Sequence, residues 1–109
     1  MILIVVKFPV RSDRADEWAT LAGEYARAVR SEEGNLFFEW SRSLDEPDTY
    51  VCVEGFRDSD AGASHVGTDA FKDFVDAAPD LVSRQPEIIY VDAPDVPGWG
   101  PMGEIQPRS

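Results

Sequence analysis

Two segments of this 109-residue chain repeat apolar residues every three or four positions, and short apolar runs surround each of them. The first segment holds Trp18, Leu21, Ala22, Tyr25, Ala28 and Val29, and the second holds Phe71, Phe74, Val75, Ala78, Leu81 and Val82. This spacing places the apolar side chains on one face of a helix. Because each helix must bury that face, the pattern predicts two amphipathic helices packed on a sheet.

Residues at both ends of the first helical segment are typical of helix termini. Ser12 and Asp13 are expected to cap its N-terminus through their side-chain oxygens. Gly34 is expected to follow its C-terminus, because glycine adopts a positive φ without a Cβ clash.

The second helical region is divided by further capping and breaking residues. The polar run 58–60 is expected to cap a short helix over residues 61–66, which Gly67 ends. Thr68 is then expected to cap the second amphipathic helix, and Pro86 to end that element.

Four short runs rich in β-branched and aromatic residues predict strands over residues 2–8, 35–43, 50–57 and 87–92. The turn-forming residues 45–48 join the middle two strands into a hairpin. The order is therefore β-α-β-β-α-β, which is typical of a ferredoxin-like α+β fold. Right-handed crossovers then give an antiparallel sheet with both helices on one face.

This pattern fills residues 1–92, which we expect to form one domain, and leaves residues 93–109 as an irregular tail with four prolines and three glycines. Residues 98–103 match the spacing of a dinucleotide-binding loop, but no crossover helix can follow them, so the match is accidental. Trp99 and Met102 are expected to anchor the tail on the body of a dimer.

The dimer is predicted from strands that are apolar on both sides. The first strand carries Ile2, Ile4 and Val6 on one side and Leu3 and Val5 on the other. Leaving the sheet face without helices in water would cost about 25 cal/mol per Å² of apolar surface. The tail is too short to cover it, so we expect a homodimer with the sheets face to face. The alternative is that the strand ends only look two-sided.

Charge and cysteine content exclude several classes of protein. Ten basic and 21 acidic residues give a net charge of −11, which repels nucleic acid and anionic membranes. The single cysteine, Cys52, excludes intrachain disulfides and four-thiolate metal sites. No run approaches the roughly 20 apolar residues of a membrane span, and no export signal is evident, so we expect a cytoplasmic protein.

His65 is the only histidine and the leading candidate for a catalytic residue. Its side chain can take and return a proton near neutral pH. The alternative is a buried histidine that only bonds a carbonyl group. Asp58 and Asp60 lie nearby, but their spacing fits no metal-ligand motif, and we expect neither a metal site nor another cofactor.

Aromatic residues on facing elements could line a pocket for a flat ligand. These candidates are Phe38, Trp40, Tyr50, Phe56, Phe71 and Phe74. The alternative is an ordinary aromatic core, and Trp40 is the better pocket candidate because its N–H needs a partner when buried. Glu39 and Glu54 lie within strands, where a carboxylate could act as a base, but we favour structural pairing with arginines such as Arg42 or Arg57.

Three segments, residues 32–40, 50–58 and 61–74, together resemble the antibiotic biosynthesis monooxygenase family. The matching positions are Glu32, Gly34, Asn35, Leu36 and Glu39, then Glu54, Phe56 and Asp58, then His65, Thr68 and Phe71, with Glu33 as the alternative for the first acid. The resemblance implies a dimeric α+β barrel of ferredoxin-like topology. It covers residues 1–92 and says nothing of the tail.

The resemblance implies a fold more firmly than a reaction. Some members oxygenate quinols, anthrones or other electron-rich aromatics with O₂ and without metal or flavin. Others cleave haem, isomerise their substrates or have no known activity. The haem-degrading branch has an Asn on the first strand and a Trp where this chain has Phe56, which argues against haem cleavage.

The resemblance therefore predicts a cofactor-independent monooxygenase of a small aromatic quinol or phenol. His65 would be the base or hydrogen-bond partner of the phenolate, and Asn35 and Trp40 would orient substrate oxygens. Phe38, Phe56, Phe71 and Phe74 complete the predicted substrate-binding set. Two alternatives stay open, namely a dimeric small-molecule binding protein without catalysis and an isomerase or decarboxylase on the same barrel.

Overall fold

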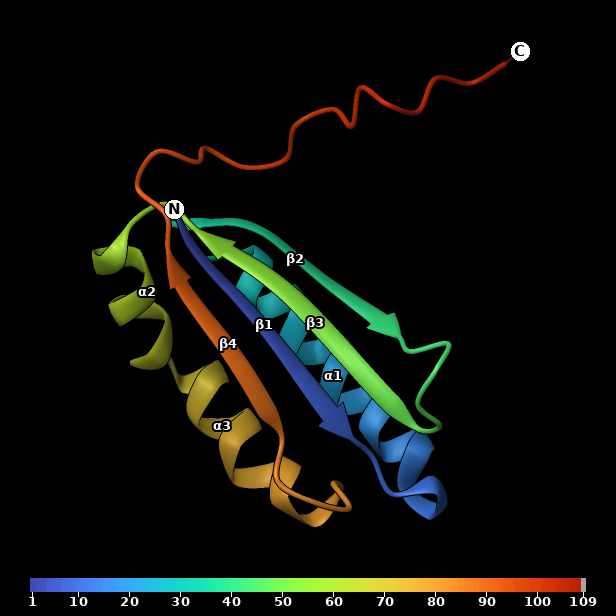
Figure 1. The fold of residues 1–109 in the computed structure, drawn as a ribbon. Helices are drawn as coiled ribbons and strands as arrows, with labels where there is room; N and C mark the ends of the chain where they lie inside the picture. The colour runs from blue at the N-terminus through green and yellow to red at the C-terminus, as the bar shows by residue number, and fades with distance from the viewer. Residues whose placement is uncertain (109) are drawn as a thin grey trace.

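The structure, a computed structural model, describes residues 1–108 and has the predicted order of elements (Figure 1). The strands are β1 (Ile2–Pro9), β2 (Asn35–Arg42), β3 (Thr49–Phe56) and β4 (Glu87–Asp92). The helices are η1 (Ser12–Arg14), α1 (Ala15–Arg30), α2 (Ser59–Val66), α3 (Asp69–Ala77) and η2 (Ala78–Asp80). None of the helices within residues 1–108 has the length and apolar character needed to cross a membrane.

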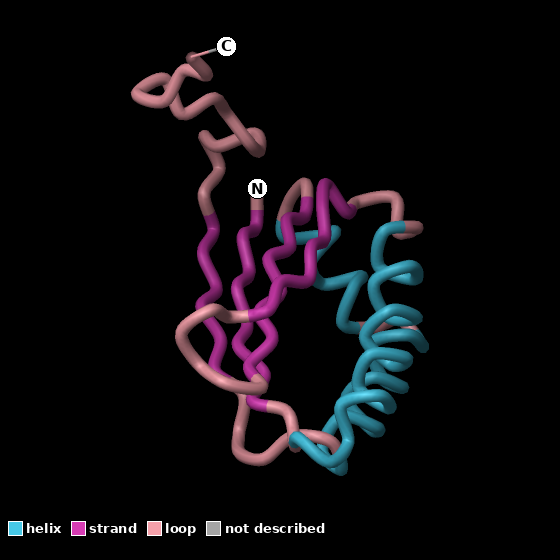
Figure 2. The backbone as a smooth tube through the Cα atoms, turned by 90° about the vertical axis from the view of Figure 1, so that its right-hand side faces the viewer, coloured by secondary structure: helices cyan, strands magenta, loops and turns pink. Residues whose placement is uncertain are grey.

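The four strands form one sheet in the order β2-β3-β1-β4, and every neighbouring pair is antiparallel. All helices lie on one face of this sheet, as the side view in Figure 2 shows. The structure thus confirms the ferredoxin-like α+β fold that was predicted from the order of the elements.

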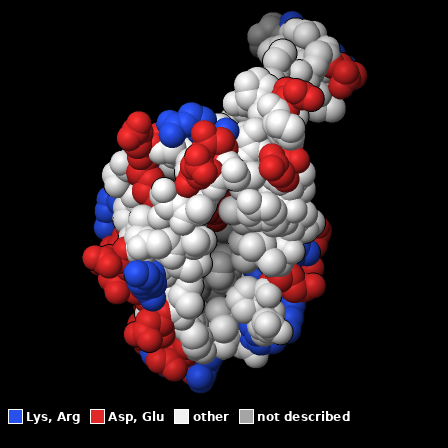
Figure 3. All heavy atoms as spheres, turned by 90° about the vertical axis from the view of Figure 1, so that its left-hand side faces the viewer, with Lys and Arg blue, Asp and Glu red and all other residues white. Residues whose placement is uncertain are grey.

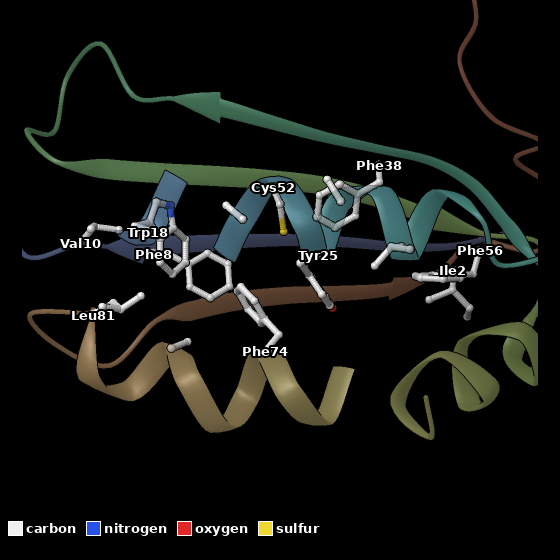
Figure 4. Packing of buried hydrophobic residues seen from close by; sticks show 14 of the residues in the cluster. Ile2, Phe8, Val10, Trp18, Tyr25, Phe38, Cys52, Phe56, Phe74 and Leu81 are labelled. Atoms are coloured by element: carbon white, nitrogen blue, oxygen red, sulfur yellow. The ribbon is translucent and has the colours of Figure 1, made fainter. Parts of the chain in front are cut away.

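The core lies between the helices and the sheet (Figure 4). The sheet side is supplied by alternate residues of β1 and β3, including Ile2, Cys52 and Phe56, each of which is buried. From α1, Trp18 packs against the ring of Phe8 with the two centroids 5.1 Å apart. Large rings therefore fill most of the space between the layers, as helix periodicity predicted.

The first helix begins differently from the prediction. Residues Ser12–Arg14 form a 3₁₀ turn, and α1 starts without a side-chain cap. Asp13 instead pairs with Arg11, with 3.1 Å between the Arg11 Nη2 and the Asp13 Oδ2. The capping role that we expected for Ser12 and Asp13 is therefore wrong, because the Asp13 carboxylate is already occupied by this ion pair.

Gly34 does not have the positive φ that was expected of it, since Gly98 is the only glycine in residues 1–108 with such a φ. Ser31 follows the last turn of α1 instead. Gly34 is required for a different reason, because a Cβ on it would overlap the Cβ of Ala61 in α2. A close approach of two elements, and not a helix terminus, selects glycine here.

The predicted caps of the later helices are confirmed. Asp58 accepts a hydrogen bond from the Ala61 N–H at 2.9 Å, and Thr68 accepts one from the Phe71 N–H at 3.1 Å. The second amphipathic helix is shorter than predicted: α3 ends at Ala77, and η2 follows with Pro79 in it. Proline lacks the N–H that an α-helix needs, so the helix stops well before Pro86.

The sheet face without helices is apolar and open. Register places Leu3, Val5, Phe37, Val53, Ile89 and Val91 on it, and we call this set the outer face. Ile89 is 64% exposed and Val91 is 41% exposed. The strands therefore carry apolar side chains on both faces of the sheet, as the sequence predicted.

The tail after β4 is irregular and extends away from the sheet (Figure 1). Its Trp99 ring lies 5.2 Å from the ring of Phe37 on the outer face, yet Trp99 stays 69% exposed. Met102 is also exposed. The tail thus contacts the outer face through one ring, and its last residue, Ser109, lies outside the described residues.

The contact between Gly34 and Ala61 gives a first prediction. Gly34→Ala should lower the free energy of unfolding by about 1–3 kcal/mol, because the added methyl group forces α2 away from the connection before β2. Urea denaturation measures this change. Gly23→Ala is the control: it lies within α1 with no atom closer than 3.9 Å to a new Cβ, so it should stabilise by about 0.5–1 kcal/mol. Equal effects of the two variants would contradict the close-approach explanation.

Candidate functional site

His65 lies on α2 and is buried against the sheet, with 2% of its surface exposed. Its Nδ1 lies 3.0 Å from the Glu32 Oε2, and its Nε2 lies 3.0 Å from the Tyr25 hydroxyl. Both ring nitrogens therefore have polar partners inside the protein. A histidine held in this way has a fixed ring orientation and a defined proton position.

The two partners of His65 come from the first helix and the connection that follows it. Tyr25 projects from α1 and stacks on Phe74 of α3, with ring centroids 4.1 Å apart. Glu32 follows the end of α1, and its side chain is 16% exposed. Because three elements converge on one ring, packing of the helices sets the geometry of the site.

Glu54 on β3 adds a second carboxylate on the other side of His65. Its Oε1 lies 3.5 Å from the His65 Nε2, and its Oε2 accepts a hydrogen bond from the Cys52 thiol at 3.3 Å. The residue is 4% exposed, and this burial raises the pKa of its carboxyl group. The structural pairing with Arg42 or Arg57 that we expected for Glu54 is therefore wrong.

The surroundings define which atoms carry protons. The Glu32 carboxyl group lies against Nδ1 and accepts from Nδ1–H, which leaves the lone pair on Nε2. Burial raises the pKa of Tyr25, so its hydroxyl stays neutral and donates to Nε2. Burial also raises the pKa of the Cys52 thiol, which stays protonated and donates to Glu54. The site thus offers one basic nitrogen between two carboxylates.

Two phenylalanines lie against the imidazole ring. The Phe56 centroid lies 4.7 Å from that of His65, and the Phe71 centroid lies 5.2 Å away at an interplanar angle of 75°. Phe56 is fully buried, whereas Phe71 is partly exposed. The imidazole ring therefore contacts apolar rings, while its two nitrogens meet the polar groups of Tyr25, Glu32 and Glu54.

A cleft opens beside this site, between β4 and the helices α2 and α3 (Figure 3). On the helix-facing side of the sheet, Ile4 pairs with Tyr90 and Val6 pairs with Ile88. Ile4 and Val6 are partly buried, and Ile88 and Tyr90 are 63% and 58% exposed. The helices thus leave an apolar strip of the sheet accessible next to the buried network.

Most of the predicted aromatic pocket residues pack in the core. Phe38, Phe56 and Phe74 are each at most 5% exposed and contact other rings. Phe71 is partly exposed and touches His65, so it is the aromatic residue best placed to meet a ligand.

The two predicted polar substrate contacts already have partners. The Trp40 Nε1–H donates to the Ala22 carbonyl oxygen at 2.9 Å. The Asn35 amide donates to the carbonyl oxygens of Phe37 and Gly55, where a bulge interrupts the pairing of β2 with β3. Both side chains stabilise backbone in this structure, and their roles in binding substrate stay predictions.

Three members of the network were not among the predicted site residues. Tyr25 was counted only in the apolar face of its helix, and Glu32 was quoted only as part of the family pattern. Glu54 was assigned a structural role, although strand alternation places it on the same face as Cys52 and Phe56. A carboxylate on the apolar face of a strand is the feature that could have identified it.

Asp58, which was considered and rejected as a metal ligand, caps α2 as described above. Within residues 1–108, no group of three His, Cys, Asp or Glu side chains is arranged to hold a metal ion.

The fold and the site define a ferredoxin-like α+β protein with a buried histidine–carboxylate network beside an apolar cleft. The family model described as "Antibiotic biosynthesis monooxygenase" matches residues 1–77. This chain therefore belongs to the antibiotic biosynthesis monooxygenase family, and the resemblance drawn from its motifs is confirmed.

Individual relatives agree with this assignment. The Bacillus subtilis protein named "Putative monooxygenase YcnE" is 26% identical over 92 residues, which are 84% of this chain and 97% of that protein. The uncharacterized protein sll1783 of Synechocystis is 26% identical over 87 residues; these are 80% of this chain but only 59% of the length of sll1783.

Solved structures share the fold. A Caulobacter crescentus protein named "Putative antibiotic biosynthesis monooxygenase" superposes with a TM-score of 0.80 at 31% identity, over 84% of this chain and 88% of that one. Rv0793 from Mycobacterium tuberculosis superposes with a TM-score of 0.81 at 18% identity, over 89% of this chain and 98% of that one. At the latter identity the likeness shows the fold alone.

The burial of Glu54 predicts a specific pH dependence of stability. Its pKa in the folded state is raised above the ordinary value of 4.5. As the pH rises above 4.5, the unfolded chain loses this proton first. The free energy of unfolding of the wild type should therefore fall relative to that of Glu54→Gln, by up to about 1.4 kcal/mol per pH unit, until the folded carboxyl group also ionises.

Urea titrations of both proteins between pH 4 and 8 measure this difference. Glu24→Gln, which alters an exposed carboxylate on α1, controls for the loss of one charge. A constant difference between wild type and Glu54→Gln over the whole range would show that Glu54 is not buried as described.

Proposed function

We propose that this protein is a cofactor-independent monooxygenase that uses O₂ to oxidise a small aromatic quinol or phenol. The observation that carries this proposal is the buried imidazole of His65, hydrogen-bonded to Glu32 and Tyr25 beside an apolar cleft. Family membership supports the same class of reaction, and the relative YcnE carries monooxygenase in its name.

Proton transfer is the step that the protein's own residues would assist. The lone pair of the His65 Nε2 would accept the proton of a substrate hydroxyl group, and the Tyr25 hydroxyl beside it would donate to the phenolate oxygen. Glu32 and Glu54 would stabilise the imidazolium that forms. General base catalysis of this kind contributes about 10²–10⁴ in rate.

The deprotonated substrate would then supply all the electrons. A quinol of the naphthalene series, C₁₀H₈O₂, reacts with O₂ to give a hydroxyquinone, C₁₀H₆O₃, and one H₂O. One oxygen atom enters the ring and the other leaves as water, while the substrate gives up four electrons. Ile4 and Val6 of the apolar strip, together with Phe71 of α3, would hold the ring and limit access of water to the reactive intermediate.

His65→Ala tests this proposal. Metal-free wild-type protein should consume O₂ with a naphthohydroquinone at a rate above the uncatalysed autoxidation. The variant should lose about 10²–10⁴ of kcat, because the base is gone. Val66→Ala, which truncates the exposed neighbour of His65 on the same helix, should stay within about twofold of wild type.

The outcomes separate the rival functions. Unchanged turnover in a folded His65→Ala protein would remove His65 from the mechanism. Thermal stabilisation by the quinol without O₂ uptake would favour a binding protein that does not catalyse. Product formation under anaerobic conditions would favour an isomerase or a decarboxylase.

We also propose that the protein acts as a homodimer through the outer face. The support is the row of apolar side chains on that face, where Ile89 and Val91 are exposed and Val53 is partly buried, with the Trp99 ring of the tail next to it. A two-fold axis through the face would pair this surface with itself and remove it from water.

Val53→Glu should therefore weaken dimerisation, because it buries a carboxylate at the centre of the outer face. We expect the dimer dissociation constant to rise on the order of 100-fold, as measured by sedimentation equilibrium. Val66→Glu makes the same change on α2, away from the sheet, and should leave assembly unaltered. A wild-type protein that sediments as a monomer at micromolar concentration would refute the dimer.

A further inference from the structure

A cavity of about 490 Å³ lies beneath the C-terminal half of α3 and the connection to β4. Its walls are mostly apolar and include Phe8, Phe74, Val75, Val82 and Pro86. Its volume lies within the range of small-molecule sites, about 300–1,000 Å³. The shape and lining suit one or two fused rings.

Arg84 is the single charged residue that lines this cavity. In a chain with a net charge of −11, a cation at the mouth of an apolar cavity is a local exception. Within residues 1–108, Arg84 forms no ion pair. Its guanidinium group is thus available to a ligand from solution.

The carboxylates that share the neighbouring hollow with Arg84 are already paired with other arginines. Asp13 pairs with Arg11 at 3.1 Å, and Asp48 lies 3.9 Å from Arg42. These pairs reduce the negative charge that would otherwise neutralise Arg84 or repel an anion. Arg84 is therefore the one charged residue lining the cavity, and no carboxylate within residues 1–108 pairs with it.

Backbone contacts hold the segment that carries Arg84. The Arg11 N–H donates to the Leu81 carbonyl oxygen at 2.8 Å, and the Ser83 N–H donates to the Pro9 carbonyl oxygen at 2.8 Å. An isolated β-bridge also joins Val82 to Val10. This fixed backbone lowers the entropy cost of placing the arginine against a bound anion.

We propose that this cavity binds an aromatic carboxylate, with the rings between Phe8, Phe74 and Val82 and the carboxylate on Arg84. Arginine suits this role because its planar guanidinium donates two parallel hydrogen bonds to a carboxylate. Phe74 lines the cavity and also stacks on Tyr25, whereas neither Tyr25 nor His65 is among the lining residues, so this site is separate from the histidine network. The proposed site is an additional ligand site beside the histidine network, and it does not depend on the proposed function.

Binding is tested with a pair of probes that O₂ does not oxidise under the assay conditions, 2-naphthoate and its neutral amide, 2-naphthamide. Titration calorimetry should show that the wild type binds the acid about tenfold or more tightly than the amide, since charge-assisted hydrogen bonds are the stronger ones. Arg84→Ala should lose this preference and keep its affinity for the amide. Arg84→Lys should retain part of the preference, because a point charge replaces the fork.

Arg27→Ala, which removes an exposed arginine from α1, is the matched control and should bind both probes as the wild type does. Equal affinity of the wild type for acid and amide, or an unchanged preference in Arg84→Ala, would overturn the proposed site. Because neither probe is oxidised, these results do not depend on turnover. A preserved preference for the acid in a protein without O₂ uptake would keep the binding site and reject only the monooxygenase function.

Discussion

The hydrogen bond between Glu32 and His65 is the interaction on which the arrangement of the candidate site depends. It joins the connection after α1 to α2, and both side chains are largely removed from water. A buried charge without a partner costs several kcal/mol, so neither residue is tolerated there alone. Tyr25 and Glu54 complete the network from α1 and β3. The four side chains meet only when both helices are seated on the sheet, which makes the site a consequence of the complete fold.

The strands and the order of the elements were predictable because their cause is local. Apolar side chains that alternate or repeat every three to four residues must face a core, and this requirement fixed all four strands to within two residues. The helix ends were less predictable, because a polar side chain near a helix end can either cap the helix or pair with another residue. Asp13 could cap a helix or pair with Arg11, and the ion pair prevailed. Gly34 matched the pattern of a glycine that follows a helix. Glycine is required there instead because a side chain would overlap Ala61 on another element, and local sequence does not show such a contact.

The sequence identified His65, the central residue of the site, but it did not identify the residues that contact His65. His65 stood out because histidine is the side chain that ionises near neutral pH, and His65 is the only histidine in the sequence. The partners depend on contacts between elements. Tyr25 fits an apolar helix face equally well whether or not its hydroxyl meets a histidine, and only the docking of α2 gives that hydroxyl a role. For Glu54 the prediction of a structural pairing with Arg42 or Arg57 considered partners along the sheet, although its side chain points toward the helices, where His65 lies.

Strand β4 shows how the unfilled parts of this molecule are related to its function. All six of its residues are exposed, although four of them are large and apolar. On one face this exposure arises because β4 has no second layer. On the other face, α2 and α3 stand away from the strand, and the cleft beside the histidine network opens there (Figure 3). Closing that cleft with larger side chains would bury more apolar surface in the monomer, but it would also remove the apolar strip beside the histidine network from solvent. An edge strand that is left uncovered on its inner face therefore costs stability and leaves an apolar cleft open, the kind of concave apolar surface that small-molecule sites use.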